Sequence, residues 1–237
     1  MRAFTNFADD STRSLLGILA DKSSSEELYR SAMGKLGEAL AEVIAREFAT
    51  ACRGSVYLVC TVEDADFLAR GLLEGLLATG VDSSQVRFAC FWNERSRKFT
   101  NSDIEAFDIA PIVKQYKEPV DVSSTLLIMV KSIISGACVV KTNLSTLVEK
   151  AIPQRVIVAA PVMVRGSKDR LASEFSPELA GRFEYVTFAL DDPATGADHL
   201  VEPGIGGSVY KRLGMENKAS YVPDLVKRRR RSFSATA

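Results

Sequence analysis

The chain alternates short apolar runs with stretches in which apolar residues recur every three or four positions. This alternation constrains the fold more than any other feature of the sequence. Runs such as Val56–Cys60 and Leu126–Val130 are continuously apolar, as expected of strands that are buried on both faces of a sheet. Between such runs, the apolar spacing is that of an amphipathic helix. Strands that alternate with helices predict an α/β fold, in which a mainly parallel sheet is flanked by helices.

The same patterns predict the bounds of the elements. Ser24 and Glu27 form a predicted capping box at the start of a helix over residues 25–50. Further helices are predicted over residues 67–77 and 139–150, with a partly helical segment over 161–180. The predicted strands cover residues 56–60, 86–92, 126–130, 156–160 and 185–190. Residues 93–103 are predicted to form a polar loop.

Composition places the chain among ordinary globular proteins. Of its 237 residues, 46% are hydrophobic and 25% are charged. Thirty acidic side chains balance thirty Lys and Arg side chains, so net charge favours neither nucleic acid nor a membrane surface as a partner. No apolar run reaches the roughly 18 residues that cross a bilayer, and the first ten residues lack the apolar core of a signal peptide. We therefore expect a cytoplasmic protein with free cysteines and no membrane partner.

A basic run, Lys227–Arg231, lies near the end of the chain. We expect a single domain over residues 1–226, with an N-terminal helical part over about 12–50, and a disordered basic tail over 227–237. Adjacent cations favour contact with nucleic acid or with a protein partner, or serve as a nuclear address in a eukaryotic cell. The alternative is a solvated tail that binds nothing.

One loop is a candidate phosphate site. In open parallel sheets, ligands bind beyond the carboxyl ends of the strands. Residues 131–138 connect a predicted strand to a predicted helix through small side chains, so several backbone N–H groups and the helix N-terminal partial charge face one spot. The alternative is a tight connection without a ligand. The candidate phosphate-binding residues are Ser132, Ser135, Gly136, Ala137 and Cys138.

A second candidate loop, Glu202–Gly214, contains four glycines and a proline. Glycine lets backbone amides approach a ligand closely, although most Pro-Gly clusters are plain turns. Asp191 follows a predicted strand before this loop and is a candidate hydrogen-bond acceptor for a ligand, or else a helix or turn cap. The candidate ligand-binding residues of the loop are Gly204, Ile205, Gly206, Gly207 and Ser208.

Several of these segments resemble, in order and spacing, the uracil phosphoribosyltransferases of the type I phosphoribosyltransferase family. The resemblance covers about residues 13–215 and is carried by Leu19–Lys22, Val130–Cys138, Ala159–Pro161, Leu190–Asp191 and Pro203–Gly206. It implies a type I phosphoribosyltransferase fold, a homo-oligomer, and phosphoribosyl pyrophosphate (PRPP) or a nucleotide monophosphate as ligand. It further implies a base as the ligand of the candidate residues in the Glu202–Gly214 loop, and a base or ribose as that of Asp191. It also places Arg95 and Arg97 near a pyrophosphate group, where the alternative is a solvated loop.

The residues that this family uses for chemistry are mostly replaced. Val130 stands where the family has an aspartate that holds the ribose, and Gly207 and Tyr210 replace two acids that assist magnesium and pyrophosphate. Glu63 and Asp64 stand in a turn that carries a positive charge in the family. Adjacent carboxylates repel a polyanion unless magnesium bridges them, which makes this pair a candidate metal site.

Three hypotheses for function follow. The first is a protein with a degenerate active site that binds a phosphoribosyl or nucleotide ligand without turnover, as a regulatory binder. The second is an active phosphoribosyltransferase with an altered base substrate, PRPP as donor and Mg²⁺ as cofactor. The third is a scaffold or interaction subunit whose cleft is vestigial.

Overall fold

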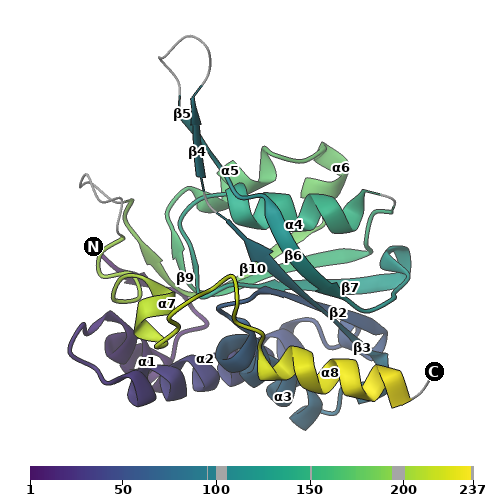
Figure 1. Ribbon diagram of the computed structural model, residues 1–237, viewed down its shortest axis with the longest axis horizontal. Coiled ribbons are helices and arrows are strands. Elements are labelled where there is room, and N and C mark those ends of the chain that lie inside the picture. Colours follow the sequence, from purple (N-terminus) through teal and green to yellow (C-terminus); the bar gives the residue numbers. More distant parts are fainter. Residues whose placement is uncertain (95, 100–105, 150, 194–200, 236–237) are drawn as a thin grey trace.

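The computed structural model describes residues 1–94, 96–99, 106–149, 151–193 and 201–235. Its centre is an eight-stranded sheet in the order β1-β10-β9-β7-β2-β3-β6, with β8 paired to β9 (Figure 1). The strands are β1 (Ala3–Phe4), β2 (Ser55–Thr61), β3 (Val86–Asn93), β6 (Ile112–Lys117), β7 (Thr125–Val130), β8 (Ile133–Ile134), β9 (Arg155–Val164) and β10 (Phe183–Asp191). The two edge strands, β1 and β6, are antiparallel to their neighbours, and the other pairs are parallel. The predicted mainly parallel α/β fold is therefore confirmed.

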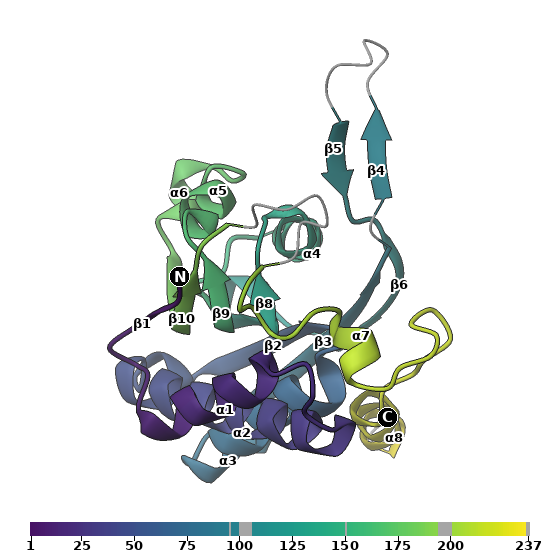
Figure 2. The ribbon, with the colours of Figure 1, turned by 90° about the vertical axis from the view of Figure 1, so that its left-hand side faces the viewer.

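Helices cover both faces of the sheet (Figure 2). The helices α1, α2, α3 and α8 lie on one face, and α4, α5 and α6 lie on the other. The helices are α1 (Asp10–Ala20), α2 (Glu26–Glu47), α3 (Arg70–Ala78), α4 (Cys138–Val148), α5 (Ser167–Ala172), α6 (Pro177–Ala180), α7 (Val209–Arg212) and α8 (Asp224–Ala235). Single turns are η1 (Ala51–Arg53), η3 (Ser83–Gln85), η4 (Val122–Ser124) and the π-helical η2 (Ala65–Ala69).

The central strands separate two apolar cores. Along β2, Leu58 and Cys60 pack into the core beneath α2 and α3, whereas Tyr57 and Val59 pack into the core beneath α4. Side chains of a strand alternate between its two faces, so a strand with helices on both sides must be apolar throughout. This is why the continuous apolar runs identified the central strands correctly.

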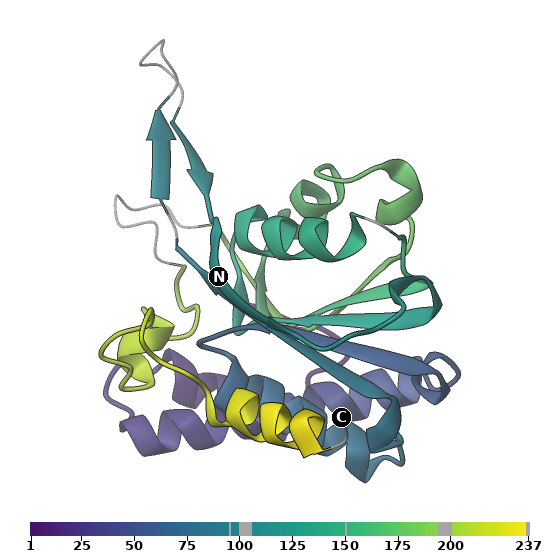
Figure 3. The same cartoon turned by 45° about the vertical axis from the view of Figure 1, so that its right-hand side comes forward.

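Two local expectations need correction. The helix α2 is capped by Ser25, whose side chain accepts from the Leu28 amide, while the Ser24 hydroxyl donates to the Ile18 carbonyl. The predicted polar loop after β3 contains the strand β4 (Ser96–Phe99), which pairs with β5 (Ala106–Ile109). These two strands project from the body of the protein (Figure 3).

In the described part of the chain, no helix is long and apolar enough to cross a membrane.

The predicted disorder of the basic tail is wrong, because Asp224–Ala235 forms the helix α8. The buried Asp66 side chain accepts hydrogen bonds from the backbone amides of Asp224 and Leu225, both at 2.9 Å, at the first turn of α8. A carboxylate at a helix N-terminus satisfies amides that have no partner within the helix and complements the helix dipole. Leu225 and Val226 are then buried in the core.

A second anchor lies within the basic run itself. Arg229 donates through Nε to Oε1 of Glu118 at 2.7 Å and through Nη2 to Oε2 at 2.5 Å. Glu118 also accepts from the Phe88 amide and the Tyr116 hydroxyl. The pKa of Arg229 is raised by this hydrogen-bonded pairing with Glu118. The predicted disordered tail, whether it contacts a partner or is solvated, did not anticipate that the third residue of the run pairs with a buried carboxylate.

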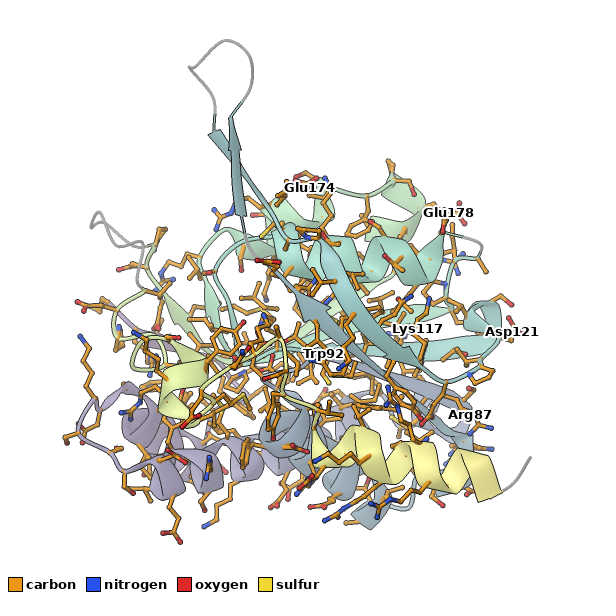
Figure 4. The ribbon with its side chains drawn as sticks, viewed as in Figure 1. Arg87, Trp92, Lys117, Asp121, Glu174 and Glu178 are labelled. Carbon is orange, nitrogen blue, oxygen red and sulfur yellow. The ribbon has the colours of Figure 1, made fainter. Side chains whose placement is uncertain are left out.

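The segment before α8 is tied to the centre of the molecule as well. The indole N–H of Trp92 donates to the Tyr221 carbonyl at 2.9 Å, and Trp92 lies well inside the structure (Figure 4). The other cations of the run, Lys227, Arg228, Arg230 and Arg231, are exposed. A contact between these side chains and nucleic acid or another protein stays a prediction.

Replacing Arg229 by alanine tests whether α8 is part of the fold. The change leaves the buried Glu118 carboxylate without its cation, so we expect the free energy of unfolding to fall by about 3 kcal/mol. The same change at exposed Arg228 is expected to stay within about 0.5 kcal/mol of the wild type. Urea unfolding of the two variants measures both values, and equal stabilities would contradict the docked helix.

Candidate functional site

A buried ionic cluster lies at the carboxyl ends of the neighbouring strands β2 and β7. Lys131 follows β7, and its ammonium nitrogen lies 2.9 Å from Glu63 Oε1 and 3.1 Å from Asp64 Oδ2, in the turn after β2. The same nitrogen donates to the Thr61 hydroxyl at 3.2 Å. Asp64 also accepts from the Ser132 amide at 3.1 Å. Because the two strands are parallel and paired, the turns after them meet at one edge of the sheet.

Glu63 connects this cluster to residues of the glycine loop and of the segment after α7. Its Oε1 accepts from Lys131 and, at 3.3 Å, from the Tyr210 hydroxyl, and its Oε2 lies 3.6 Å from the Lys218 ammonium. Lys218 also lies over the Tyr210 ring and donates to its hydroxyl. Burial alone would raise the pKa of Glu63, but the charges of Lys131 and Lys218 outweigh it and lower the pKa to about 2. Glu63 is therefore an ionised carboxylate at neutral pH.

The predicted metal pair, Glu63 and Asp64, is occupied by this cation. A magnesium ion between the two carboxylates would have to displace the Lys131 ammonium, which bonds to both. Among the described residues, no group of three or more His, Cys, Asp or Glu side chains has an arrangement that holds a metal ion. The residues present do not fit magnesium at this place.

A pocket of about 230 Å³ opens beside the cluster. It gathers residues from three of the loops that the sequence singled out: the turn after β2, the connection from β7 to α4, and the glycine loop before α7. Charged and polar groups of its wall come from Glu63, Lys131, Ser135, Tyr210 and Lys218. The remaining wall is largely apolar and is formed by Ile133, Val139, Val201, Ile205 and Val209, with Gly207 and Ser208.

The candidate phosphate loop is only partly in place. Ser135 lines the pocket, but Ser132 is fully buried, and its amide is used by Asp64. The strand β8 occupies Ile133–Ile134, so the loop pairs with β9 instead of wrapping a ligand. The helix α4 nevertheless begins at Cys138, next to Ala137 and exposed Gly136, without a side-chain cap in this described segment. Its first amides retain the partial positive charge expected of a helix start.

The glycine loop divides into residues that face the protein body and residues that face the pocket. A Cβ at Gly204 would lie 2.2 Å from the Val201 carbonyl oxygen, and one at Gly206 would lie 2.3 Å from that of Leu19. A Cβ at Gly207 would meet no atom of the described residues within 4 Å. The Tyr29 hydroxyl donates to the Ile205 carbonyl, which fixes the loop to α2. Only Ile205, Gly207 and Ser208 of the five candidate residues therefore line the pocket.

Asp191 has a structural position instead of the predicted ligand contact. Its fully buried carboxylate accepts from Arg2 Nε at 2.8 Å, from Arg2 Nη2 at 2.7 Å and from the Gly204 amide at 2.9 Å. It thus joins Arg2, the residue before β1, to the glycine loop and has the turn-stabilising role that the sequence left open. Of the other two candidates, Arg95 lies outside the described residues, and Arg97 belongs to β4, where its backbone pairs with Asp108.

Two residues of the pocket were missed by the sequence analysis. Lys218 lies in the irregular segment between α7 and α8, and nothing in the neighbouring sequence marks it as a partner of the distant Glu63. Tyr210 was noted only as a replacement for an acid, yet its hydroxyl bonds to Glu63. The available signal was a tyrosine and a lysine in or shortly after a loop rich in glycine.

Comparisons with known proteins give a fold likeness and no family. No protein-family model matches the chain, and no curated protein matches it. The AQ2163 protein from Aquifex aeolicus is similar in structure, with a TM-score of 0.62, 12% identity, and 92% of this chain and 100% of that chain covered. At this identity the likeness shows the fold alone.

Two further solved structures overlay more loosely. TT1426 from Thermus thermophilus gives a TM-score of 0.45 at 14% identity, over 71% of this chain and 86% of that chain. The hypoxanthine-guanine phosphoribosyl transferase of L. donovani gives a TM-score of 0.35 at 15% identity, over 68% of this chain and 77% of that chain. We draw nothing from overlays this loose, and the uracil specificity that the sequence suggested has no support among the three.

The ionic cluster makes stability depend on pH in acid. The pKa of Glu63 is about 2 in the folded protein against an ordinary value of 4.5. Its contribution to the free energy of unfolding is therefore present above about pH 4.5 and is lost as the pH falls toward 2. By linkage this amounts to about 3 kcal/mol. We expect Glu63→Gln to have a flatter dependence of unfolding free energy on pH between 5.5 and 3 (about the range of carboxylate titration). Glu42→Gln, on the exposed face of α2, is the matched control and should retain the wild-type slope.

The two glycines of the loop provide a second test. Both have positive φ, +73° at Gly206 and +104° at Gly207, so alanine at either position adds backbone strain of about 1 kcal/mol or more. Gly206→Ala also forces a contact with the Leu19 carbonyl, and we expect about 1–3 kcal/mol of additional destabilisation. Thermal unfolding of both variants measures the difference. Equal losses would mean that the loop does not press against α1 as described.

Proposed function

We propose that the protein binds a small phosphorylated ribose compound, a sugar phosphate or the sugar-phosphate part of a nucleotide, in the pocket beside Glu63, without phosphoribosyl transfer from PRPP. The observation that carries this proposal is the pocket itself. It brings Ser135 and Val139, which flank the uncapped start of α4, together with two lysines and the backbone of the glycine loop around one space of about 230 Å³.

The chemistry of the wall suits such a ligand. The start of α4 and Lys218 attract an anion, and the aliphatic side chains of Ile205 and Val209 offer apolar contacts to the carbon face of a sugar. The space is smaller than the roughly 300–1,000 Å³ of pockets that enclose drug-sized molecules. A sugar phosphate fits this scale better than a complete dinucleotide or a bulky cofactor.

The same wall argues against turnover with PRPP. Phosphoribosyl transfer needs a held pyrophosphate leaving group, and an ionised Glu63 in the wall repels a polyanion. The candidate magnesium pair is already neutralised by Lys131. Within the described residues, no observation favours the transferase alternative over binding.

Calorimetric titration separates these alternatives. We expect ribose 5-phosphate and uridine monophosphate to bind at one site, and PRPP to bind more weakly with or without magnesium. Lys218→Met should weaken binding of ribose 5-phosphate about tenfold or more, because it removes a cation from the phosphate. Lys211→Met, on the exposed side of α7, is the matched control.

Either of two results would contradict the proposal. If none of the three compounds binds, the pocket is not a phosphate site, and the result favours the hypothesis of a scaffold subunit with a vestigial cleft. If PRPP binds most tightly and only with magnesium, the protein retains a donor site, and a screen of acceptor bases for transferase activity follows.

A further inference from the structure

One oxygen of Glu63 accepts no hydrogen bond from the residues that the structure describes. Glu63 is only 5% exposed, and its Oε1 accepts from both Lys131 and Tyr210. Its Oε2 is buried and accepts no hydrogen bond from the described residues. The Lys218 ammonium lies 3.6 Å away, beyond hydrogen-bond distance. Leaving a buried charged acceptor unsatisfied is unfavourable, so this oxygen calls for a donor that the described protein does not supply.

Lys218 is placed to control access to this oxygen. It comes from the irregular segment between α7 and α8, lines the pocket together with Glu63, and its side chain is 23% exposed, against 6% for Glu63. The Lys218 ammonium donates to the Tyr210 hydroxyl, and its contact with Glu63 Oε2 at 3.6 Å is an ion pair without a hydrogen bond, so an anion in the pocket competes with Glu63 for this ammonium. A phosphate that draws Lys218 toward itself uncovers Glu63 Oε2.

We propose that Glu63 Oε2 accepts a hydrogen bond from a hydroxyl group of the ligand, and that this contact forms when the ligand's phosphate draws Lys218 away from Glu63. The inference rests on the proposed function and makes it more specific. The pocket selects an anion that also carries a hydroxyl donor, and Glu63 is the specificity-determining residue. Neither half of the ligand suffices: inorganic phosphate lacks an alcohol hydroxyl that lies apart from its charged oxygens, and free ribose lacks the charge that moves Lys218.

Lys131 explains why the carboxylate can serve as an acceptor beside a phosphate. Its ammonium bonds to Glu63 and Asp64 together, and it remains within the protein wall when Lys218 moves. Glu63 therefore keeps one cation while its second oxygen turns to the ligand. A second phosphate group would lie against the carboxylate, which is unfavourable. The arrangement thus accounts for discrimination against a pyrophosphate on the same sugar.

The test compares methyl phosphate, which has no hydroxyl beyond the phosphate itself, with ribose 5-phosphate by calorimetry. In the wild type we expect ribose 5-phosphate to bind at least about tenfold more tightly. In Glu63→Ala this preference should fall to about threefold or less, while methyl phosphate binds as in the wild type or better. Glu216→Gln, an exposed change outside this pocket, should keep the full preference.

A further variant protects the test if alanine at position 63 prevents folding. Glu63→Gln keeps the shape but loses the charge of the acceptor, so the preference should fall at least about threefold. If ribose 5-phosphate binds and neither Glu63 variant alters the preference, the inference about Glu63 is overturned while the proposed function stands. If neither phosphate compound binds to the wild type, both are overturned.

Discussion

The ionic cluster of Lys131 with Glu63 and Asp64 is the interaction on which the candidate site depends. Burying charges is costly unless they are paired and hydrogen-bonded. Here one ammonium donates hydrogen bonds to two carboxylates and a threonine hydroxyl. The cluster ties the turn after β2 to the connection after β7, and through Glu63 it reaches Tyr210 and Lys218. The pocket wall is thereby fixed to the central strands of the sheet.

Much of the fold was predictable because burial on two faces leaves a strong signal. The strands β2, β3, β7 and β9 are mostly apolar along their length, and β10 is apolar over most of its second half, since helices cover both sides of the sheet. The edge strand β6 was missed, because it alternates half-buried Ile112 and Tyr116 with exposed Val113, and so short a half-buried strand gives a weak signal in a single sequence. The helix α8 was missed because its anchors, Asp66 and Glu118, lie far away in the sequence.

The site was less predictable than the fold for a related reason. Loop positions could be inferred, because the carboxyl ends of parallel strands meet at one edge, and three of the candidate loops do line one pocket. The direction in which each side chain points could not be inferred from the sequence. Asp191 has the type and position of a ligand contact, but Arg2 and the Gly204 amide occupy its oxygens. Conversely, Lys218 belongs to no recognisable motif, and only its distance to Glu63 in the structure identifies it as a residue of the site.

A crystal structure grown with ribose 5-phosphate is the most direct test of the proposed site. We expect the phosphate between the start of α4 and Lys218, a ribose hydroxyl within hydrogen-bond distance of Glu63 Oε2, and Lys131 still bonded to Glu63 and Asp64. A ligand outside this pocket would contradict the assigned site, and a ligand bound in it with Lys218 still against Glu63 would contradict the role of Lys218.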